Sequence, residues 1–228
     1  MAFVPAYREG GGPIEARPFY IASGTAIKKG EIVKFTPGTG IEAVAGTDFD
    51  DPALGVAAEE HDGSTAGRQS GTEILVYCDP DIVYKVVPKT ESTADSGDAT
   101  SWVDAEFTAA DDIFNGGKIV ITDTNDVDGF EVGDVLDITD FANSGGDFTV
   151  TGAGGTIAAG MKGYVYPGDL AVGSHAFDLD SDGTNIDMKT AGGASLIITG
   201  TSYDAAKKET TVYCKLRLHQ FGNYVVAL

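Results

Sequence analysis

Three histidines and several acidic residues are the groups in this chain that could carry chemistry. His61 lies beside Glu60 and Asp62, and such a cluster could bind a metal ion or transfer a proton. The surrounding segment, 59–71, is polar and rich in glycine, which is typical of a surface loop. Because neighbouring residues of a loop rarely converge on one ligand, we interpret this segment as a solvated loop and not as a site.

A calcium-binding pattern begins at Asp178. Asp178, Asp180 and Asp182 alternate along the chain and Gly183 follows them, which is the D-x-D-x-D-G start of a calcium loop. The twelfth position, where a bidentate Glu belongs, holds Lys189, and no flanking helices are predicted. An EF-hand is therefore not expected, and the sequence leaves two interpretations, an incomplete Ca²⁺ site and a plain acidic turn.

No catalytic motif accompanies these residues. His61, His175 and His219 lie in none of the usual nucleophile or metalloprotease patterns. Cys78 and Cys214 both lie in apolar strand patterns, so we interpret them as buried free thiols and not as a disulfide or a nucleophile. Paired carboxylates for glycoside hydrolysis stay open, because 35 acidic residues guarantee chance pairs. We expect a protein that is not an enzyme and that uses no cofactor other than the Ca²⁺ considered above.

The overall charge restricts the partners. The chain has 228 residues, and its 15 Lys and Arg against 35 Asp and Glu give a formal charge of −20. Such a surface repels nucleic-acid backbones and anionic membranes, so we expect neither as a partner. The N-terminal sequence lacks the pattern of a signal peptide, and no apolar run approaches membrane-spanning length. These features favour synthesis and retention in a cytosol, unless an assembly carries the chain elsewhere.

The clearest structural pattern lies between residues 26 and 60. Gly30 provides a tight turn, and three short runs of β-forming residues follow it, separated by turn residues: 32–35, 41–45 and 53–58. Three strands joined by tight turns predict a meander, which is the start of a small antiparallel barrel or sandwich.

Similar short strands recur along the rest of the chain, so the predicted fold is all-β. We predict a small antiparallel β-barrel or sandwich with a glycine-rich β insertion and an extended N-terminal arm. The predicted order is an arm at 1–18, a first β block at 19–92, a linker with a short helical turn at 93–115, and a second β block at 116–228. Within the second block, 116–170 is the insertion and 194–223 completes the core.

The N-terminal arm contains residue types that are enriched at protein interfaces. Phe3, Tyr7 and Arg8 precede a glycine-rich stretch, and this composition cannot form a core of its own. One interpretation is an arm that contacts another chain through these three side chains. The other is a frayed terminus.

The segment 210–221 alternates cleanly between apolar and polar residues, as a half-buried strand does. Lys215, Arg217 and His219 share one predicted face and form a local positive stripe in an acidic chain. Pairing with acidic neighbours in the same sheet is one interpretation of this stripe, and a partner-binding face is the other.

The order of strands and turns resembles that of the capsid cement or head decoration proteins of tailed bacteriophages. The resemblance covers residues 19–88 and about 174–223 and rests on these segments: KKGEIVKF, IEAVAG, PALGVAAEE, EILVYCDPDIVYKV, ASLIITG and TTVYCKLRLHQFGN.

This resemblance implies a protein made in the host cytoplasm that binds the outer surface of the assembled major capsid shell and stiffens it against internal pressure. It also implies a homo-oligomer, a trimer or a dimer, at local symmetry axes of the virion. On this hypothesis the capsid or subunit contacts are Phe3, Tyr7, Arg8, Lys215, Arg217 and His219.

The main alternative is a carbohydrate-binding or receptor-binding β-module on a particle surface. Glycine-rich all-β domains commonly present aromatic side chains to sugars, and binding of the isolated protein to glycans would favour this interpretation. An enzyme is a third class, and turnover of a substrate would favour it.

Overall fold

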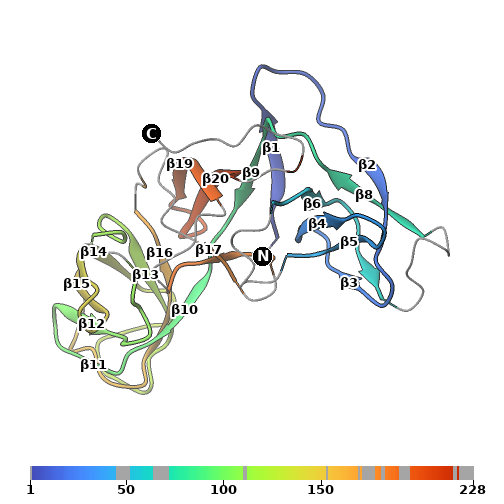
Figure 1. Ribbon diagram of the computed structural model, residues 1–228. Helices are drawn as coiled ribbons and strands as arrows, with labels where there is room; N and C mark the ends of the chain where they lie inside the picture. The colour runs from blue at the N-terminus through green and yellow to red at the C-terminus, as the bar shows by residue number, and fades with distance from the viewer. Residues whose placement is uncertain are drawn as a thin grey trace.

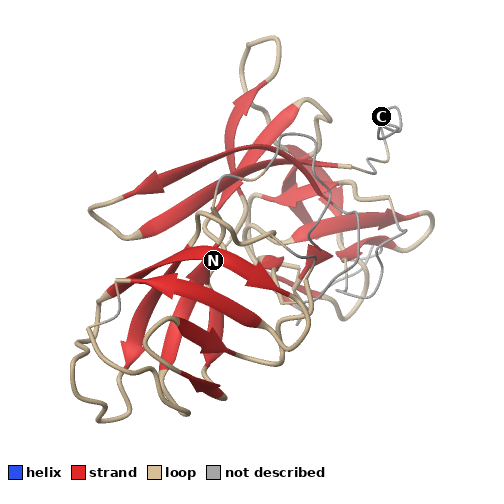
Figure 2. Cartoon of the chain, turned by 90° about the vertical axis from the view of Figure 1, so that its left-hand side faces the viewer, coloured by secondary structure: helices blue, strands red, loops and turns tan. Residues whose placement is uncertain are grey.

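The structure is a computed structural model. It describes residues 2–44, 52–63, 72–109, 112–152, 154–168, 170, 178–180, 183–189, 196–217 and 220. These residues contain twenty strands and no helix, which confirms the predicted all-β class. Three larger sheets make up most of the fold, and we name them A, B and E. Sheet A (β1, β9, β20 and β19) lies between sheet B, on the right of Figure 1, and sheet E, at the lower left. Figure 2 shows the same strands from the side.

Sheet B is a five-stranded sheet that curls into a small barrel. Its strand order is β2 (Arg17–Tyr20), β8 (Glu73–Tyr77), β6 (Gly55–Ala57), β4 (Ile32–Thr36) and β5 (Gly40–Ala43). The predicted strands of the 26–60 segment are present, but β6 pairs with β4 and not with its sequence neighbour β5. A short ribbon of β3 (Ala26–Ile27) and β7 (His61–Asp62) stands beside this barrel.

The barrel closes between β2 and β5. Ile21, just after β2, forms a bridge with Ile41, and both side chains are buried in the core of the barrel. Gly40 makes this closure possible, because a Cβ atom there would lie 2.7 Å from the carbonyl oxygen of Tyr20. Its φ of +127° also favours glycine.

Sheet A joins segments from both ends of the chain. Its strand order is β1 (Val4–Arg8), β9 (Ile82–Val86), β20 (Glu209–Leu216) and β19 (Leu196–Asp204). The structure thus corrects the predicted arm, because residues 4–8 pair with β9 inside the fold. The side chain of Phe3 is only 2% exposed, and its N–H donates to the carbonyl oxygen of Gly30. A buried aromatic side chain ties the N-terminal segment down.

Sheet E lies, in sequence, between β9 and β19 of sheet A. Its strand order is β10 (Thr90–Thr93), β16 (Lys162–Tyr166), β13 (Lys118–Asp123), β14 (Val135–Ala142), β15 (Asp147–Thr151), β12 (Ser101–Val103) and β11 (Ser96–Gly97). The inserted sheet therefore begins at Thr90 and not at 116, and the predicted linker at 93–115 contains the last residue of β10 and all of β11 and β12. Residues 112–116 form turns in place of the predicted helical turn, while 110 and 111 lie outside the described residues.

All four residues of β10 are polar, so the sequence does not show it as a strand, yet the structure buries two of them, Thr90 and Ser92. Ser92 is buried, accepts a hydrogen bond from the indole N–H of Trp102 (2.9 Å), and donates to Asp104 (2.7 Å). Asp104 also accepts from the N–H groups of Thr93 and Glu106. Since every donor of this buried network has an acceptor, polar residues can form a strand here.

The main core runs without a break from sheet A into sheet E. In sheet E it contains four phenylalanine rings with neighbouring centroids 4.7 to 5.5 Å apart: Phe107, Phe114, Phe141 and Phe148. A last short ribbon, β17 (Asp178–Leu179) with β18 (Ile186–Asp187), adds Leu179 and Ile186 to this core. The two sheets therefore share one apolar core.

Candidate interaction surface

A β-bulge in β1 brings two exposed side chains onto one face. Val4 pairs with Lys85 and Tyr7 pairs with Val83, with a shift in register between Pro5 and Tyr7. Residues three positions apart lie on opposite faces of a regular strand, but the extra residue of the bulge returns Tyr7 to the face of Val4. Val4 is 47% exposed and Tyr7 is 48% exposed, so this edge of sheet A presents apolar and aromatic surface to solvent.

The same face continues across β9 and β20. Lys85 lies opposite Tyr213, and Lys215 is two residues further along β20. Burial alternates along all of β20, with Val212, Cys214 and Leu216 inside, which confirms the predicted two faces for the described part of the 210–221 segment. We name this the outer face of sheet A, and it consists of Val4, Tyr7, Lys85, Tyr213 and Lys215.

The positive charge of the outer face is only partly compensated. Lys215 Nζ lies 2.8 Å from a carboxylate oxygen of Glu9, so for this residue the predicted pairing with an acidic neighbour is confirmed. Lys85 is exposed to solvent. Arg217, just after β20, is half-buried, and His219 lies outside the described residues. The outer face thus carries two lysines against one glutamate, in a chain whose total charge is −20.

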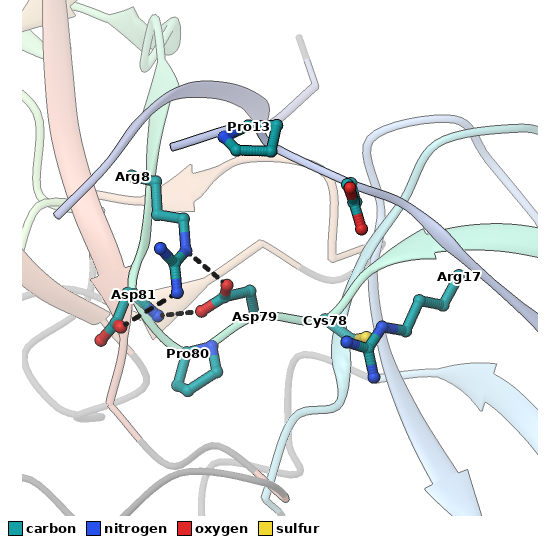
Figure 3. A pocket seen from close by; sticks show the side chains of 8 residues that line it. Arg8, Pro13, Arg17, Cys78, Asp79, Pro80 and Asp81 are labelled. Carbon is teal, nitrogen blue, oxygen red and sulfur yellow. Dashed lines mark hydrogen bonds and ion pairs between the residues drawn. The ribbon is translucent and has the colours of Figure 1, made fainter. Parts of the chain in front are cut away.

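Two of the residues predicted to contact another chain serve the fold itself. Phe3 points into the main core, where it cannot touch a partner. Arg8 lies 2.6 Å from a carboxylate oxygen of Asp79 and 3.7 Å from one of Asp81, as Figure 3 shows. The hydrogen bond from Arg8 to Asp79 raises the pKa of the guanidinium above its usual value. Arg8 therefore ties the end of β1 to the connection between β8 and β9.

A pocket opens next to this ion pair. β1 pairs with β9 and β2 pairs with β8, and residues of the two connecting segments, 9–16 and 78–81, line the pocket. The pocket between them has a volume of about 630 Å³ and is lined by Arg8, Pro13, Glu15, Arg17, Cys78, Asp79, Pro80 and Asp81 (Figure 3).

Most of the side chains that line this pocket are charged and are suited to binding a ligand. Burial raises the pKa of the Cys78 thiol, and the nearby positive charge of Arg17 only partly opposes that effect. A thiol with a raised pKa is a poor nucleophile at neutral pH. The pocket lining offers carboxylates and guanidinium groups, which can bind a ligand but form no nucleophile and base pair.

The acidic turn predicted as a calcium candidate uses its central carboxylate for its own backbone. Asp180 accepts hydrogen bonds from the N–H groups of Thr184 (3.0 Å) and Asn185 (3.1 Å). Asp182 and the side chain of Asp178 lie outside the described residues. Within the described ranges, no group of three or more His, Cys, Asp or Glu side chains is placed to hold a metal ion.

The histidine beside Glu60 and Asp62 also has a local role. His61 belongs to the short strand β7, and its Nδ1 accepts a hydrogen bond from the N–H of Gly63 (2.9 Å). The predicted loop at 59–71 therefore starts with a short ribbon, and residues 64–71 lie outside the described residues.

Val4, Lys85 and Tyr213 belong to the outer face but are not among the contact residues predicted from the sequence. The sequence contains a signal for Lys85, because it is the single charged residue in the apolar run Ile82–Val86. Its position beside Tyr213 follows from the pairing of β9 with β20, whose residues lie far apart in sequence. Local patterns do not specify such a pairing.

In the part of the chain that the structure describes, no helix is long and apolar enough to cross a membrane. Comparison of the chain with known protein families, with curated proteins and with solved structures found no match.

Proposed function

We propose that this chain is a structural virion protein of a tailed bacteriophage that binds the outer surface of the major capsid shell and stabilises it. The observation that supports this proposal most is the outer face of sheet A, which gathers Tyr7, Tyr213 and Val4 on a rigid surface. Tyrosine is enriched at protein interfaces because its ring provides large contact area and its hydroxyl group a hydrogen bond.

The charge pattern favours an acidic protein partner. Lys85 is exposed beside the two tyrosines, whereas most of the chain's charge is negative. A basic patch on an acidic molecule orients it during encounter, because the patch is attracted to an acidic surface while the remainder is repelled. We therefore infer that the capsid surface beneath the outer face carries acidic side chains.

The architecture is suited to stabilising a lattice. A chain whose sheets share one core transmits load without a hinge between sheets A and E. Each copy can bind with modest affinity, because many copies on one shell act together when they also contact one another.

Co-sedimentation with empty shells tests the proposal. The shells are assembled from the major capsid protein encoded in the same genome, and the variants are Tyr7→Ala, Tyr213→Ala and Lys85→Glu. If the tyrosines are central to the interface, each truncation removes about 2 kcal/mol, which is about a 30-fold loss of affinity. Thr149→Ala is the matched control, because Thr149 is an exposed strand residue of sheet E.

Each result of this co-sedimentation assay has a different meaning for the proposal. Loss of binding in the three outer-face variants with retention in Thr149→Ala supports the proposal. Binding that is unchanged in all four variants removes the outer face from the account, and absence of binding by the wild-type protein removes the shell as partner.

A second candidate function is a carbohydrate-binding or receptor-binding module. Its supporting observation is a small pocket of about 120 Å³ at one end of the barrel, lined by Tyr20, Phe35, Gly38 and Gly40. Both rings are well exposed, at 40% and 37%, and exposed aromatic faces can pack against a sugar ring. A glycan-array signal that Tyr20→Ala abolishes would establish this function, and an array without signal would reject it.

A further inference from the structure

The outer strands of the three larger sheets differ in how they are protected against pairing with other chains. Proteins usually guard such strands with charged residues, with proline or by keeping them very short. β2 and β5 meet where the barrel closes, and β11 has only two residues. Two further outer strands contain proline or charged residues: Pro5 and Arg8 in β1, and Glu91 in β10.

The exception is β19, the outer strand of sheet A. It spans nine residues, Leu196–Asp204, and pairs with β20 alone among the described strands. Its first eight residues contain neither proline nor a charged side chain. Ser202 and Tyr203 near its end are exposed. A long, uncharged edge of this kind is a template for another strand.

Gly200 provides a second and independent indication. Its φ lies outside the left-handed region, and a Cβ atom placed on it would meet no atom of the described residues within 4 Å. Neither the backbone conformation nor packing against the described residues therefore requires glycine at this position. A glycine inside a strand can also mark a place where another backbone approaches closely.

We propose that β19 pairs antiparallel with β19 of a second copy of this chain, which joins two copies of sheet A into one eight-stranded sheet. The bulge between Ile198 and Gly200 changes the face on which the following residues lie. The regular segment available for pairing is therefore 200–204. A two-fold axis at its centre places Ser202 opposite Ser202 of the second copy.

This register is favourable in both packing and charge. Thr201 lies opposite Tyr203 of the second copy, and pairs of a β-branched residue with an aromatic residue stabilise sheets. Asp204, the one charged residue of β19, lies opposite Gly200 of the second copy and not opposite itself. Two molecules with a charge of −20 each repel one another, so contact through an uncharged strand costs the least.

The strand that pairs with β19 comes from a second copy of this chain, because the segment 200–204 is complementary to itself. A closed two-fold interface uses the same patch on both subunits, as most homo-oligomers do. Directly opposed residues of an antiparallel ladder share one face, so the outer faces of both sheets A lie on the same side of the joined sheet. The inference does not depend on capsid binding, although a doubled outer face would increase avidity for a lattice.

Sedimentation velocity and a cysteine cross-link test the pairing. We expect the wild-type protein to form a dimer. Ser202→Lys and Ser202→Glu should each raise the dissociation constant of this dimer at least tenfold, because a charged side chain on an edge strand disfavours pairing with another strand. Ser202 is exposed, so these variants retain the fold. The controls are Thr149→Lys and Thr149→Glu, at an exposed residue of an inner strand of sheet E.

The cross-link fixes the register. Directly opposed residues have Cα atoms about 4.5 or 5.5 Å apart, which is within the range of a disulfide. Ser202→Cys is therefore expected to form a covalent dimer on mild oxidation, whereas Thr149→Cys should form no covalent cross-link. A monomeric wild-type protein, a dimer that both Ser202 charge variants leave intact, or absence of the cross-link would overturn the proposal. None of these results depends on whether shells are bound.

Discussion

The effect of Phe3→Ala on the free energy of unfolding shows whether the N-terminal segment is packed into the fold or is a free arm. Phe3 is 2% exposed and belongs to the main core, so truncation removes a buried ring from packed surroundings. The neighbouring backbone has little room to collapse into the cavity, because a Cβ atom on Gly30 would already lie 2.9 Å from the carbonyl oxygen of Phe3. Buried Phe→Ala substitutions cost about 3 to 5 kcal/mol, and we expect about 3 kcal/mol for this residue near a chain end.

Urea unfolding measures this effect, followed by far-UV circular dichroism and by the fluorescence of Trp102. For a chain of this size, about 3 kcal/mol also corresponds to a melting temperature lower by roughly 6 to 12 °C. Val4→Ala is the matched control, since Val4 is the next residue and is 47% exposed, and we expect a change within about 0.5 kcal/mol. Equal stability of Phe3→Ala and wild-type protein would refute the placement of β1 in sheet A.

The other predictions concern buried groups. Burial raises the pKa of Cys214 to about 12 and also raises that of Cys78, so a thiol reagent at pH 8 should label neither in the native state and both in urea; rapid labelling of native Cys214 would contradict its burial. Burial also raises the pKa of Tyr84, and above about pH 9 the unfolded chain loses these protons first. The free energy of unfolding should therefore fall with rising pH by roughly 1.4 kcal/mol per unit for each such group, and a flat alkaline profile would refute this reasoning. Asp104→Ala leaves the donors of Ser92 and two backbone N–H groups without their acceptor, and should lower the free energy of unfolding by about 3 kcal/mol in the same urea assay; a loss below about 1 kcal/mol would show that water replaces the carboxylate.

The elements that could be predicted from sequence are those with a strong local pattern. The alternation within 210–221 predicts both faces of β20, and the turn residues between the runs 32–35 and 41–45 predict the hairpin of β4 and β5. In both places the side chains alone decide which residues are buried. The all-β class follows from the same kind of evidence repeated along the chain.

The elements that could not be predicted depend on distant partners. The polar residues of β10, Thr90–Thr93, show no strand pattern, yet the hydrogen bond from Ser92 to Asp104 makes a buried polar strand possible. The N-terminal segment resembles a free arm because β9, its partner, begins more than seventy residues later. A sequence pattern does not contain the order of strands in a sheet.

The candidate interaction surface also contains residues that the sequence predicts and residues that it does not. Of the predicted contact residues, Tyr7 is exposed and Lys215 lies on the same face but pairs with Glu9, whereas Phe3 is buried and Arg8 pairs with Asp79. The bulge between Pro5 and Tyr7 decides the side on which Tyr7 and Arg8 lie, because it changes the face of the residues that follow it. A bulge of this kind leaves no clear signature in a strand of five residues.

Quantitative mass spectrometry of purified virions from the genome that encodes this chain tests the central claim most directly. If the chain coats the outer shell, it is present in many copies, in a fixed small-number ratio to the major capsid protein. Brief treatment of intact virions with a protease should then cleave it before the capsid protein. Absence of the chain from purified virions would contradict the account.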